Sequence, residues 1–246
     1  MSNDKNMIYG TRAVIEAVKA GKEIDRVMIK NGIEGELTRE LKIVLHQNHI
    51  NIQYVPVEKI NKITMKNHQG VIAFLSVISY QKIEDILPGI FENGETPLLL
   101  ILDRITDVRN FGAIARTAYC SGVHAIIIPS RGAAQIGSDA IKTSAGALHN
   151  INVCRHDNLK EVIDYLKKSG VNVIAATEKA GQLCYHADLR VPLAFIMGSE
   201  EDGVSPEYLK LSGNSVRVPI TSEIGSLNVS VAAGILLYET IRQRSL

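Results

Sequence analysis

The chain has 246 residues, of which 46% are hydrophobic and 22% are charged. This composition is that of an ordinary globular protein and excludes the collagen-like, coiled-coil and disordered classes. The 27 basic and 26 acidic side chains leave a formal net charge of +1. Charge alone therefore gives no sign of a nucleic-acid partner, because proteins that neutralise many phosphates usually carry a basic excess.

Neither the amino-terminal residues nor the apolar runs indicate secretion or membrane insertion. Residues 1–5 are polar, and no stretch typical of a signal peptide follows them. The longest apolar runs, such as residues 98–102, are too short to span a bilayer. The cysteines at 120, 154 and 184 lack the spacing of metal ligands. We therefore expect a cytoplasmic protein with buried, reduced thiols, no membrane segment and no bound metal.

The first eighty residues alternate between helical and strand patterns. Thr11 is expected as the N-cap of a helix, and Gly21 as the glycine that follows its end. Further elements are expected as a helix containing Leu37, Leu41, Val44 and Leu45 and as strands over residues 26–30, 52–55 and 71–78. These elements predict a small α/β domain over residues 1–80. It carries 11 basic and 8 acidic side chains, a net charge of +3.

Residues 81–96 differ in character from the segments on either side. Charged residues are mixed there with the turn-forming pairs Pro88-Gly89 and Asn93-Gly94. The pattern indicates a linker, which would separate the first domain from a second one over residues 97–246.

Unbroken apolar runs characterise the rest of the chain. Strands are expected over residues 98–102, 125–128, 173–176, 193–197 and 216–220. Helices are expected between and after them, over residues 111–121, 139–148, 159–168 and 227–242. Strands that are apolar on both faces are typical of a parallel sheet covered by helices. The fold class is therefore α/β with a parallel sheet.

The common nucleotide and hydrolase motifs are missing. No GxGxxG follows a strand, and the spacing of Gly132 and Gly137 resembles a Walker loop in which Ser138 replaces the required Lys. HExxH and GxSxG are also absent. The dehydrogenase, ATPase, zinc hydrolase and serine hydrolase interpretations all lose support.

Three expected strand ends carry polar residues, and ligands of parallel sheets bind at such ends. The first presents Asn110 and Gly112 in a turn, with Arg116 in the opening turns of the next helix. An Asx-type turn with a solvated Arg would explain the same residues. The second runs into Gly198, which would let a ligand approach the backbone, and then into an acidic stretch with Glu200. An acidic surface turn is the alternative there.

The third strand end precedes the last helix. Ser226, Asn228 and Ser230 alternate with Leu227 and Val229 at the start of that helix. Helix capping explains one such residue, but capping alone does not explain three of them.

Together, the three segments resemble a known family. The order N-x-G-x-x-x-R, then G-x-E-x-x-G, then V-P-I followed by S-L-N-V-S is similar to the signature motifs of the SpoU (TrmH-type) RNA 2′-O-ribose methyltransferases. Residues 8–14 and 68–71 resemble the substrate-binding domain of the subgroup that methylates a guanosine ribose in 23S ribosomal RNA. One departure is Val108, where the family usually has Pro.

The resemblance implies a SPOUT fold with a C-terminal trefoil knot, one of the exceptions to the rule against knots. The knot would cradle S-adenosylmethionine, and the domain that contains it would form a homodimer in which the partner chain helps to complete each site. By motif, the cofactor-binding positions are Thr177, Gly198, Val218, Ile220 and Leu227.

The implied reaction is the methylation of a ribose 2′-hydroxyl, with 23S rRNA as the expected partner. The catalytic residues implied by the motifs are Asn110, Arg116, Glu200, Ser226 and Asn228. Because a guanidinium stays protonated, Arg116 is expected to act as a fixed cation that binds a phosphate and stabilises the developing alkoxide. Other proton carriers considered are His68 and His149, and surface guesses for RNA contacts are Arg12, Lys30 and Arg39.

Two alternatives remain. Ribose methyltransferases of transfer RNA share the three motifs, although they generally lack the N-terminal domain. A non-catalytic RNA-binding or ribosome-assembly protein with the same fold is the alternative from a different class, but it would not need to keep all five catalytic residues.

Overall fold

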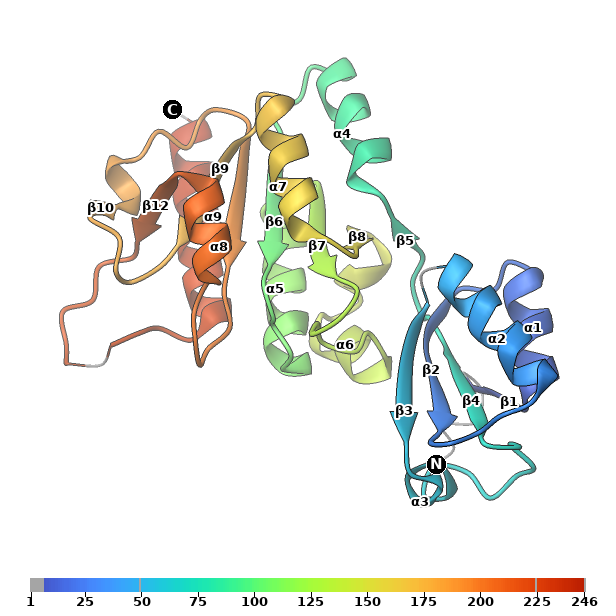
Figure 1. The fold of residues 1–246 in the computed structure, drawn as a ribbon. Helices are drawn as coiled ribbons and strands as arrows, with labels where there is room; N and C mark the ends of the chain where they lie inside the picture. The colour runs from blue at the N-terminus through green and yellow to red at the C-terminus, as the bar shows by residue number, and fades with distance from the viewer. Residues whose placement is uncertain (1–6, 49, 224, 246) are drawn as a thin grey trace. The chain divides into compact units, whose positions relative to one another are not determined.

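The structure is a computed structural model that describes residues 7–48, 50–223 and 225–245. The chain divides into two compact units, Met1–Ser79 and Tyr80–Leu246 (Figure 1). In the described ranges, no helix is long and apolar enough to cross a membrane.

Unit 1 is a four-stranded sheet with helices on both faces. Its elements are β1 (Met7–Tyr9), α1 (Thr11–Lys19), β2 (Ile24–Lys30), α2 (Glu36–Gln47), β3 (Asn51–Val55), α3 (Val57–Asn61) and β4 (Val71–Leu75). The strand order is β1-β4-β2-β3, with β2 and β3 parallel and β4 antiparallel to both β1 and β2. α1 and α2 bury one face of the sheet, around Val14, Val27 and Leu41, and α3 packs Ile60 against the other face.

Two details of unit 1 correct the sequence prediction. The N-cap of α1 is Gly10 and not Thr11, which is the first helical residue. Gly10 has φ = 93°, a conformation that Thr would adopt only with strain. The strand expected over residues 71–78 ends at Leu75, and in the turn that follows the hydroxyl of Ser76 donates a hydrogen bond to the carbonyl of Ile78 at 2.6 Å. Gly21 follows the end of α1 with φ = 71°, as predicted.

Unit 2 contains an eight-stranded sheet in which every pairing is parallel. Its strands are β5 (Tyr80–Gln81), β6 (Leu98–Leu102), β7 (Ala125–Pro129), β8 (Asn152–His156), β9 (Asn172–Ala176), β10 (Gln182–Leu183), β11 (Leu193–Met197) and β12 (Asn214–Arg217). The order is β10-β12-β9-β11-β6-β7-β8-β5. The predicted α/β class with a parallel sheet is therefore confirmed.

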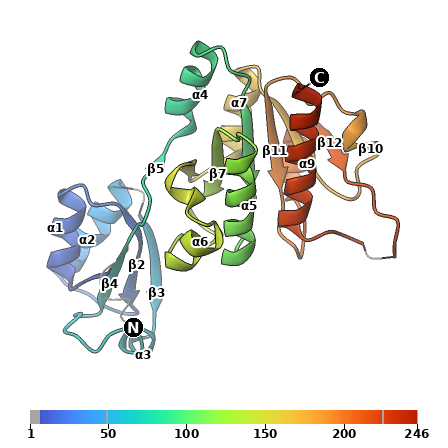
Figure 2. The ribbon, with the colours of Figure 1, turned by 180° about the vertical axis from the view of Figure 1, so that it is seen from behind.

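Helices cover both faces of this sheet. They are α4 (Ile83–Glu92), α5 (Val108–Cys120), α6 (Ser138–Thr143), α7 (Leu159–Lys168), α8 (Pro206–Ser212) and α9 (Val229–Arg244), with short 3-10 turns at Ala147–His149 and Cys184–His186. α4, α7 and α8 lie on the face seen in Figure 1, and α5 and α9 lie on the face seen in Figure 2. Every residue of β6 and β11 is buried, which explains why their sequences are unbroken apolar runs.

Residues 81–96 are not the linker that the sequence predicted. They contain the end of β5 and all of α4, whose Ile83, Leu87 and Ile90 are buried in the core of unit 2. The spacing of these three apolar residues is helical, and Pro88 and Gly89 lie inside the helix that they were expected to prevent.

Other expectations also need correction. The helix predicted over residues 139–148 breaks after Thr143, because Ala145 and Gly146 have left-handed φ values of 51° and 84°. The strand predicted over residues 216–220 is β12, which ends at Arg217. Cys120 is exposed, whereas Cys154 and Cys184 are buried as expected. β8 and α8 were not predicted. The trefoil knot stays a prediction, since strand order and register describe pairing and not threading.

Candidate functional site

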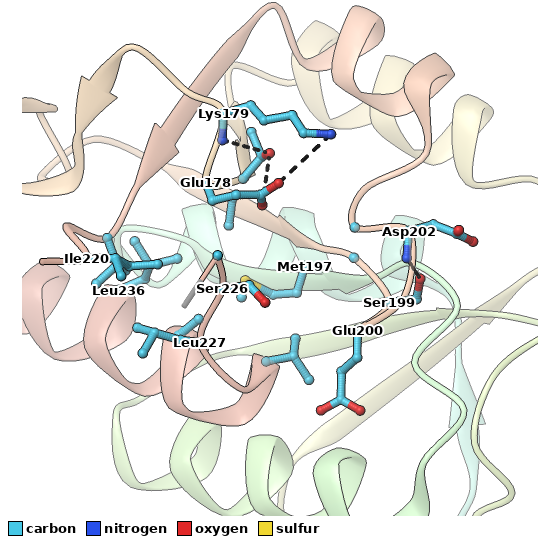
Figure 3. Close-up of a pocket in the computed structure, with 18 of the residues that line it drawn as sticks. Glu178, Lys179, Met197, Ser199, Glu200, Asp202, Ile220, Ser226, Leu227 and Leu236 are labelled. Atoms are coloured by element: carbon cyan, nitrogen blue, oxygen red, sulfur yellow. Dashed lines mark hydrogen bonds and ion pairs between the residues drawn. The ribbon is translucent and has the colours of Figure 1, made fainter. Parts of the chain in front are cut away.

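A cavity of about 410 Å³ lies beyond the carboxyl ends of β9, β11 and β12 (Figure 3). All five positions expected to bind a cofactor line it, namely Thr177, Gly198, Val218, Ile220 and Leu227. Two of the expected catalytic residues, Glu200 and Ser226, line it as well. The cavity therefore lies where open parallel sheets bind their ligands.

The wall of the cavity is apolar on one side and polar at its rim. Ile220, Leu227 and Leu236 lie together on one side, while Glu178 and Glu200 lie apart from each other on other sides (Figure 3). This combination of size, apolar wall and few polar groups is typical of a small-molecule site.

Gly198 is required by the fold of the loop that follows β11. A Cβ atom at this position would lie 2.0 Å from the backbone carbon of Gly203 and from the nitrogen of Val204. The loop folds back on itself through a bridge between Ser199 and Gly203. The sequence interpretation assigned the missing side chain to the approach of a ligand, but in the structure the chain's own backbone occupies that space.

Three residues from three motifs meet at one carboxylate. Asn110 donates a hydrogen bond from Nδ2 to Oε1 of Glu200 at 2.6 Å, and Asn228 donates to the same oxygen at 2.8 Å. Asn228 Nδ2 also donates to Oδ1 of Asn110 at 3.0 Å. The structure thus brings together Asn110, Glu200 and Asn228, which are far apart in the sequence.

Helix starts hold both amides in place. Asp107 is the N-cap of α5 and accepts hydrogen bonds from the backbone N–H groups of Arg109 and Asn110. Asn110 therefore lies in the first turn of α5 and not in the preceding turn as predicted. Asn228 is the N-cap of α9, and its Oδ1 accepts from the N–H and the hydroxyl of Ser230 at 2.9 and 2.6 Å. Because the side-chain oxygen of Asn228 accepts the capping hydrogen bonds, its Nδ2 group remains available to donate to Glu200.

A second, smaller cavity of about 240 Å³ shares part of its lining with the first. Both are lined by residues 199–202 and by Val229, and Asn110 and Asp107 line only the second. Glu200 is therefore part of the boundary between an apolar-walled cavity and a polar one. Two molecules bound in these cavities would meet at this carboxylate.

A buried charge network that sequence reasoning missed supports this loop. Asp103, 2% exposed, directly follows β6 and accepts hydrogen bonds from the N–H and the hydroxyl of Ser205, both at 2.7 Å. Arg104 donates to Asp103 at 3.1 Å, to Asp202 at 2.8 Å and to the carbonyl of Gly203 at 3.0 Å. The signal was available, because an acid that directly follows a buried strand needs a partner.

Arg116 is the expected catalytic residue that the structure does not bring to the cluster. It is exposed on α5 and lines neither cavity. Helix geometry places a residue six positions after Asn110 about 9 Å further along the axis and turned by about 120°. His68 lies in unit 1, and the exposed His149 lines neither cavity. Among the described residues, no group of three or more His, Cys, Asp or Glu side chains is arranged to hold a metal ion.

The fold and the site define a class: an α/β protein with a small-molecule cavity at the carboxyl edge of a parallel sheet, and a carboxylate anchored between that cavity and a second one. The model of the SpoU rRNA Methylase family matches residues 97–238, and the model for RNA 2′-O ribose methyltransferase substrate binding matches residues 7–81. The chain therefore belongs to the SpoU (TrmH-type) family and is an RNA 2′-O-ribose methyltransferase of the tRNA/rRNA group.

Individual relatives agree with this assignment. YacO of Bacillus subtilis (strain 168), named as a TrmH family tRNA/rRNA methyltransferase, is 33% identical over 100% of this chain and 98% of its own. A crystal structure of an RNA 2′-O ribose methyltransferase is 26% identical, with a TM-score of 0.58 over 98% of this chain and 89% of its own. The SpoU methyltransferase AviRb from Streptomyces viridochromogenes, in complex with AdoMet, is 22% identical and shares the fold with a TM-score of 0.62 over 97% of this chain and 90% of its own.

Proposed function

We propose that the chain binds S-adenosylmethionine in the 410 Å³ cavity and transfers its methyl group to the 2′-hydroxyl of a guanosine in 23S rRNA, in the cytoplasm. The observation that carries the proposal is the convergence of the cofactor positions and Glu200 on one cavity. AviRb, which shares the fold, was crystallised with AdoMet. We further propose that the chain around the cavity is threaded as a trefoil knot.

The residues of the cavity fit this cofactor. Val218, Ile220 and Leu227 provide an apolar wall for an adenine ring. Glu178 and Glu200 bring negative charge to the lining, which suits a ligand that carries a sulfonium and an ammonium group. When bound, the cofactor supplies a methyl group on a good leaving group, so the protein has to position the reactants and manage one proton.

Glu200 is the residue best placed to orient the acceptor hydroxyl. Its Oε1 is held by the two amides, whereas its Oε2 accepts no hydrogen bond from another described residue. Oε2 can therefore accept from a ribose hydroxyl that enters from the second cavity. Asn110 and Asn228 fix the carboxylate in advance, which lowers the entropy lost when the reactants align.

Arg116 supplies a fixed positive charge, and a second copy of the chain brings it to the site. α5 and α9 pack on the same face of the sheet (Figure 2). Tyr119 on α5 and Val231, Ile235 and Tyr238 on α9 are large, exposed and apolar. The three residues of α9 are spaced as one helical stripe. An apolar surface of this kind suits a homodimer interface, and Arg116 lies one turn of α5 from Tyr119.

A complementation experiment tests the dimer and the role of Arg116 together. Arg116→Ala and Asn228→Ala chains carrying different tags are co-expressed, and the mixed dimer is isolated by both tags. If Arg116 serves the partner's site, one of the two sites has every residue intact, and the mixed dimer regains about half of the wild-type activity. An inactive mixed dimer would show that Arg116 acts within its own chain. Full activity of the Arg116→Ala homodimer would show that Arg116 has no role in methyl transfer.

The RNA target is tested by parallel methyl transfer. Radiolabelled S-adenosylmethionine is supplied with 23S rRNA fragments and with tRNA, and label is expected in a guanosine of the rRNA. The substrate-binding match over residues 7–81 supports rRNA, since tRNA methyltransferases of this type generally lack that domain. Label on tRNA alone would overturn the target. Failure to bind S-adenosylmethionine in calorimetry would instead favour the non-catalytic alternative.

A further inference from the structure

Arg104 has an unusual backbone conformation just beyond the carboxyl end of β6. Its φ is 59°, in the left-handed region where the Cβ of any residue other than glycine is crowded. In the described ranges, only Gln69 and Ala145 share this feature among residues other than glycine. Glycine would take the same conformation without strain. A side chain is kept at such a position when its contacts enforce the conformation, and positions of this kind cluster at functional sites.

The guanidinium of Arg104 bonds three oxygen atoms in two different loops. Nε donates to Oδ1 of Asp103 at 3.1 Å, in the loop that follows β6. Nη1 donates to Oδ2 of Asp202 at 2.8 Å, and Nη2 donates to the carbonyl of Gly203 at 3.0 Å, both in the loop that follows β11. A planar guanidinium can bond several acceptors at once in this way, whereas the point charge of a lysine cannot.

Asp103 gives the guanidinium a fixed anchor. Its N–H donates to the carbonyl of Met197, the last residue of β11, at 2.8 Å. Its Oδ2 accepts from the N–H and the hydroxyl of Ser205, both at 2.7 Å. Met197 and Ser205 lie on either side of residues 198–204. Both ends of this loop are therefore tied to one buried residue, and Arg104 ties the interior of the loop to the same residue.

Glu200 belongs to a closed turn within this loop. The N–H of Gly203 donates to the carbonyl of Ser199 at 2.9 Å, and the N–H of Asp202 donates to Oγ of Ser199 at 3.2 Å (Figure 3). Arg104 bonds the turn at Asp202 and Gly203, so any movement of these two residues would carry Glu200 with it. The two amides described above hold the carboxylate of Glu200, whereas Arg104 holds its backbone.

Arg104 also balances charge in the second cavity. Among the described residues that line this cavity Arg104 alone is basic, and the acidic ones are Asp107, Glu200, Glu201 and Asp202. Neighbouring carboxylates repel one another, and a ribose flanked by phosphates would add to this repulsion. The guanidinium offsets part of the negative charge at the turn itself. Arg104 does not line the first cavity, so its side chain has no direct part in cofactor binding.

We propose that Arg104 is a positioning residue for methyl transfer. It holds the turn of Glu200 so that the carboxylate meets the acceptor hydroxyl in the geometry that the reaction needs. A misplacement of about 1 Å at a reacting centre can lower a rate about a hundredfold, so control of this turn has a kinetic consequence. The inference rests on the proposed function, because Glu200 is assigned to the acceptor hydroxyl there.

Arg104→Lys tests the proposal, with Arg131→Lys as the matched control. Lysine keeps the charge but cannot bond Asp103, Asp202 and the carbonyl of Gly203 together. Arg131 is exposed in the loop after β7, and its side chain forms no hydrogen bond or ion pair with another described residue. With an RNA that the wild type methylates, Arg104→Lys should lower the single-turnover rate about tenfold. Its affinity for S-adenosylmethionine should stay within about threefold of the wild type, and the control should match the wild type in both.

A double-mutant cycle with Glu200→Gln shows whether Arg104 acts through Glu200. If it does, Arg104→Lys should change the rate less than about twofold in the Glu200→Gln background. The same loss in both backgrounds would assign Arg104 a general structural role and overturn the proposal. An unchanged rate of Arg104→Lys in the wild-type background would overturn it as well.

Amide hydrogen exchange gives a second measurement that needs no RNA. Exchange at the N–H groups of Asp202 and Gly203 should be at least about tenfold faster in Arg104→Lys than in Arg131→Lys. Equal exchange in the two variants would overturn the proposal, and this measurement decides where Glu200→Gln is too slow to assay. Methylation of tRNA in place of rRNA would overturn the proposed target alone, because the cycle is run on whichever RNA the wild type methylates.

Discussion

The two units place polar groups beyond the ends of parallel strands, but they treat these groups in opposite ways. In unit 2, Glu200 is held by two amides from neighbouring helix starts. In unit 1, Arg12, Lys30 and Lys62 have no ion-pair partner in the part of the chain that the structure describes. A site for chemistry gains from groups fixed before the reactants arrive, whereas a surface for a polyanion keeps its charges free for the ligand. Substitutions in unit 2 should therefore change kcat or cofactor binding, and those at Arg12, Lys30 or Lys62 should change KM for RNA.

Gly198→Ala is expected to have the largest effect. The new Cβ would collide with backbone atoms of Gly203 and Val204 that lie 2.0 Å away, so the loop of Glu200 must move. Binding of S-adenosylmethionine, measured by calorimetry, should be lost, and methyl transfer should fall at least about a thousandfold. Gly181→Ala is the matched control, because a Cβ there meets nothing within 4 Å. Normal cofactor binding by Gly198→Ala would contradict the assigned cavity.

Asn228→Ser separates the cap of α9 from the anchoring of Glu200. Serine can still accept the hydrogen bond from the N–H of Ser230, so the helix start and the melting temperature should change little. The amide that donates to Glu200 at 2.8 Å is lost, and kcat should fall about a hundredfold. Cofactor affinity should stay within a few fold of the wild type. An unchanged kcat would show that the carboxylate needs no second amide, which would weaken the contrast between the units.

The sequence predicts residue types at strand ends better than it predicts which of them meet. The motifs containing Asn110, Glu200 and Asn228 each have an ordinary local explanation, and only the order of the parallel strands shows that they share one carboxylate. Arg116 belongs to the same motif as Asn110, yet it faces another direction, because a spacing of six residues does not return to the same side of a helix.

Sequence reasoning missed α4 and the network of Asp103 for two different reasons. The strongest turn formers of residues 81–96, Pro88 and Gly89, lie inside a helix whose buried face overrides their propensity. Asp103 was passed over because its partners, Arg104 and Ser205, come from a neighbour and from a segment about a hundred residues away. No periodicity in a single sequence reports such a contact, which depends on β6 and β11 lying side by side.

Asp103→Asn should destabilise unit 2 without touching unit 1. The buried carboxylate accepts from Ser205 twice and pairs with Arg104, so its loss leaves a charge and a donor poorly satisfied. The free energy of unfolding should fall by about 1–3 kcal/mol in urea denaturation. Asp202→Asn removes the exposed partner of the same Arg104 and should cost at most about 1 kcal/mol. Equal effects from both variants would mean that burial does not distinguish the two carboxylates.

The smallest effect concerns pH and His156. Burial lowers the pKa of His156 below its usual 6.5, although the Glu84 carboxylate 3.8 Å away opposes this shift. Nε2 of His156 accepts the N–H of Ile83 at the start of α4, which requires an unprotonated nitrogen. The unfolded chain therefore binds a proton more readily than the folded unit does. The contribution of neutral His156 to the stability of the folded unit is complete above pH 6.5 and is lost as the pH falls towards the lowered pKa of the folded state.

Urea midpoints at pH 7.5 and 5.5 should differ less in His156→Asn than in the wild type. A pH dependence that survives this substitution would have to come from other groups, and the contrast between the internally bonded unit 2 and the exposed cations of unit 1 would lose this support.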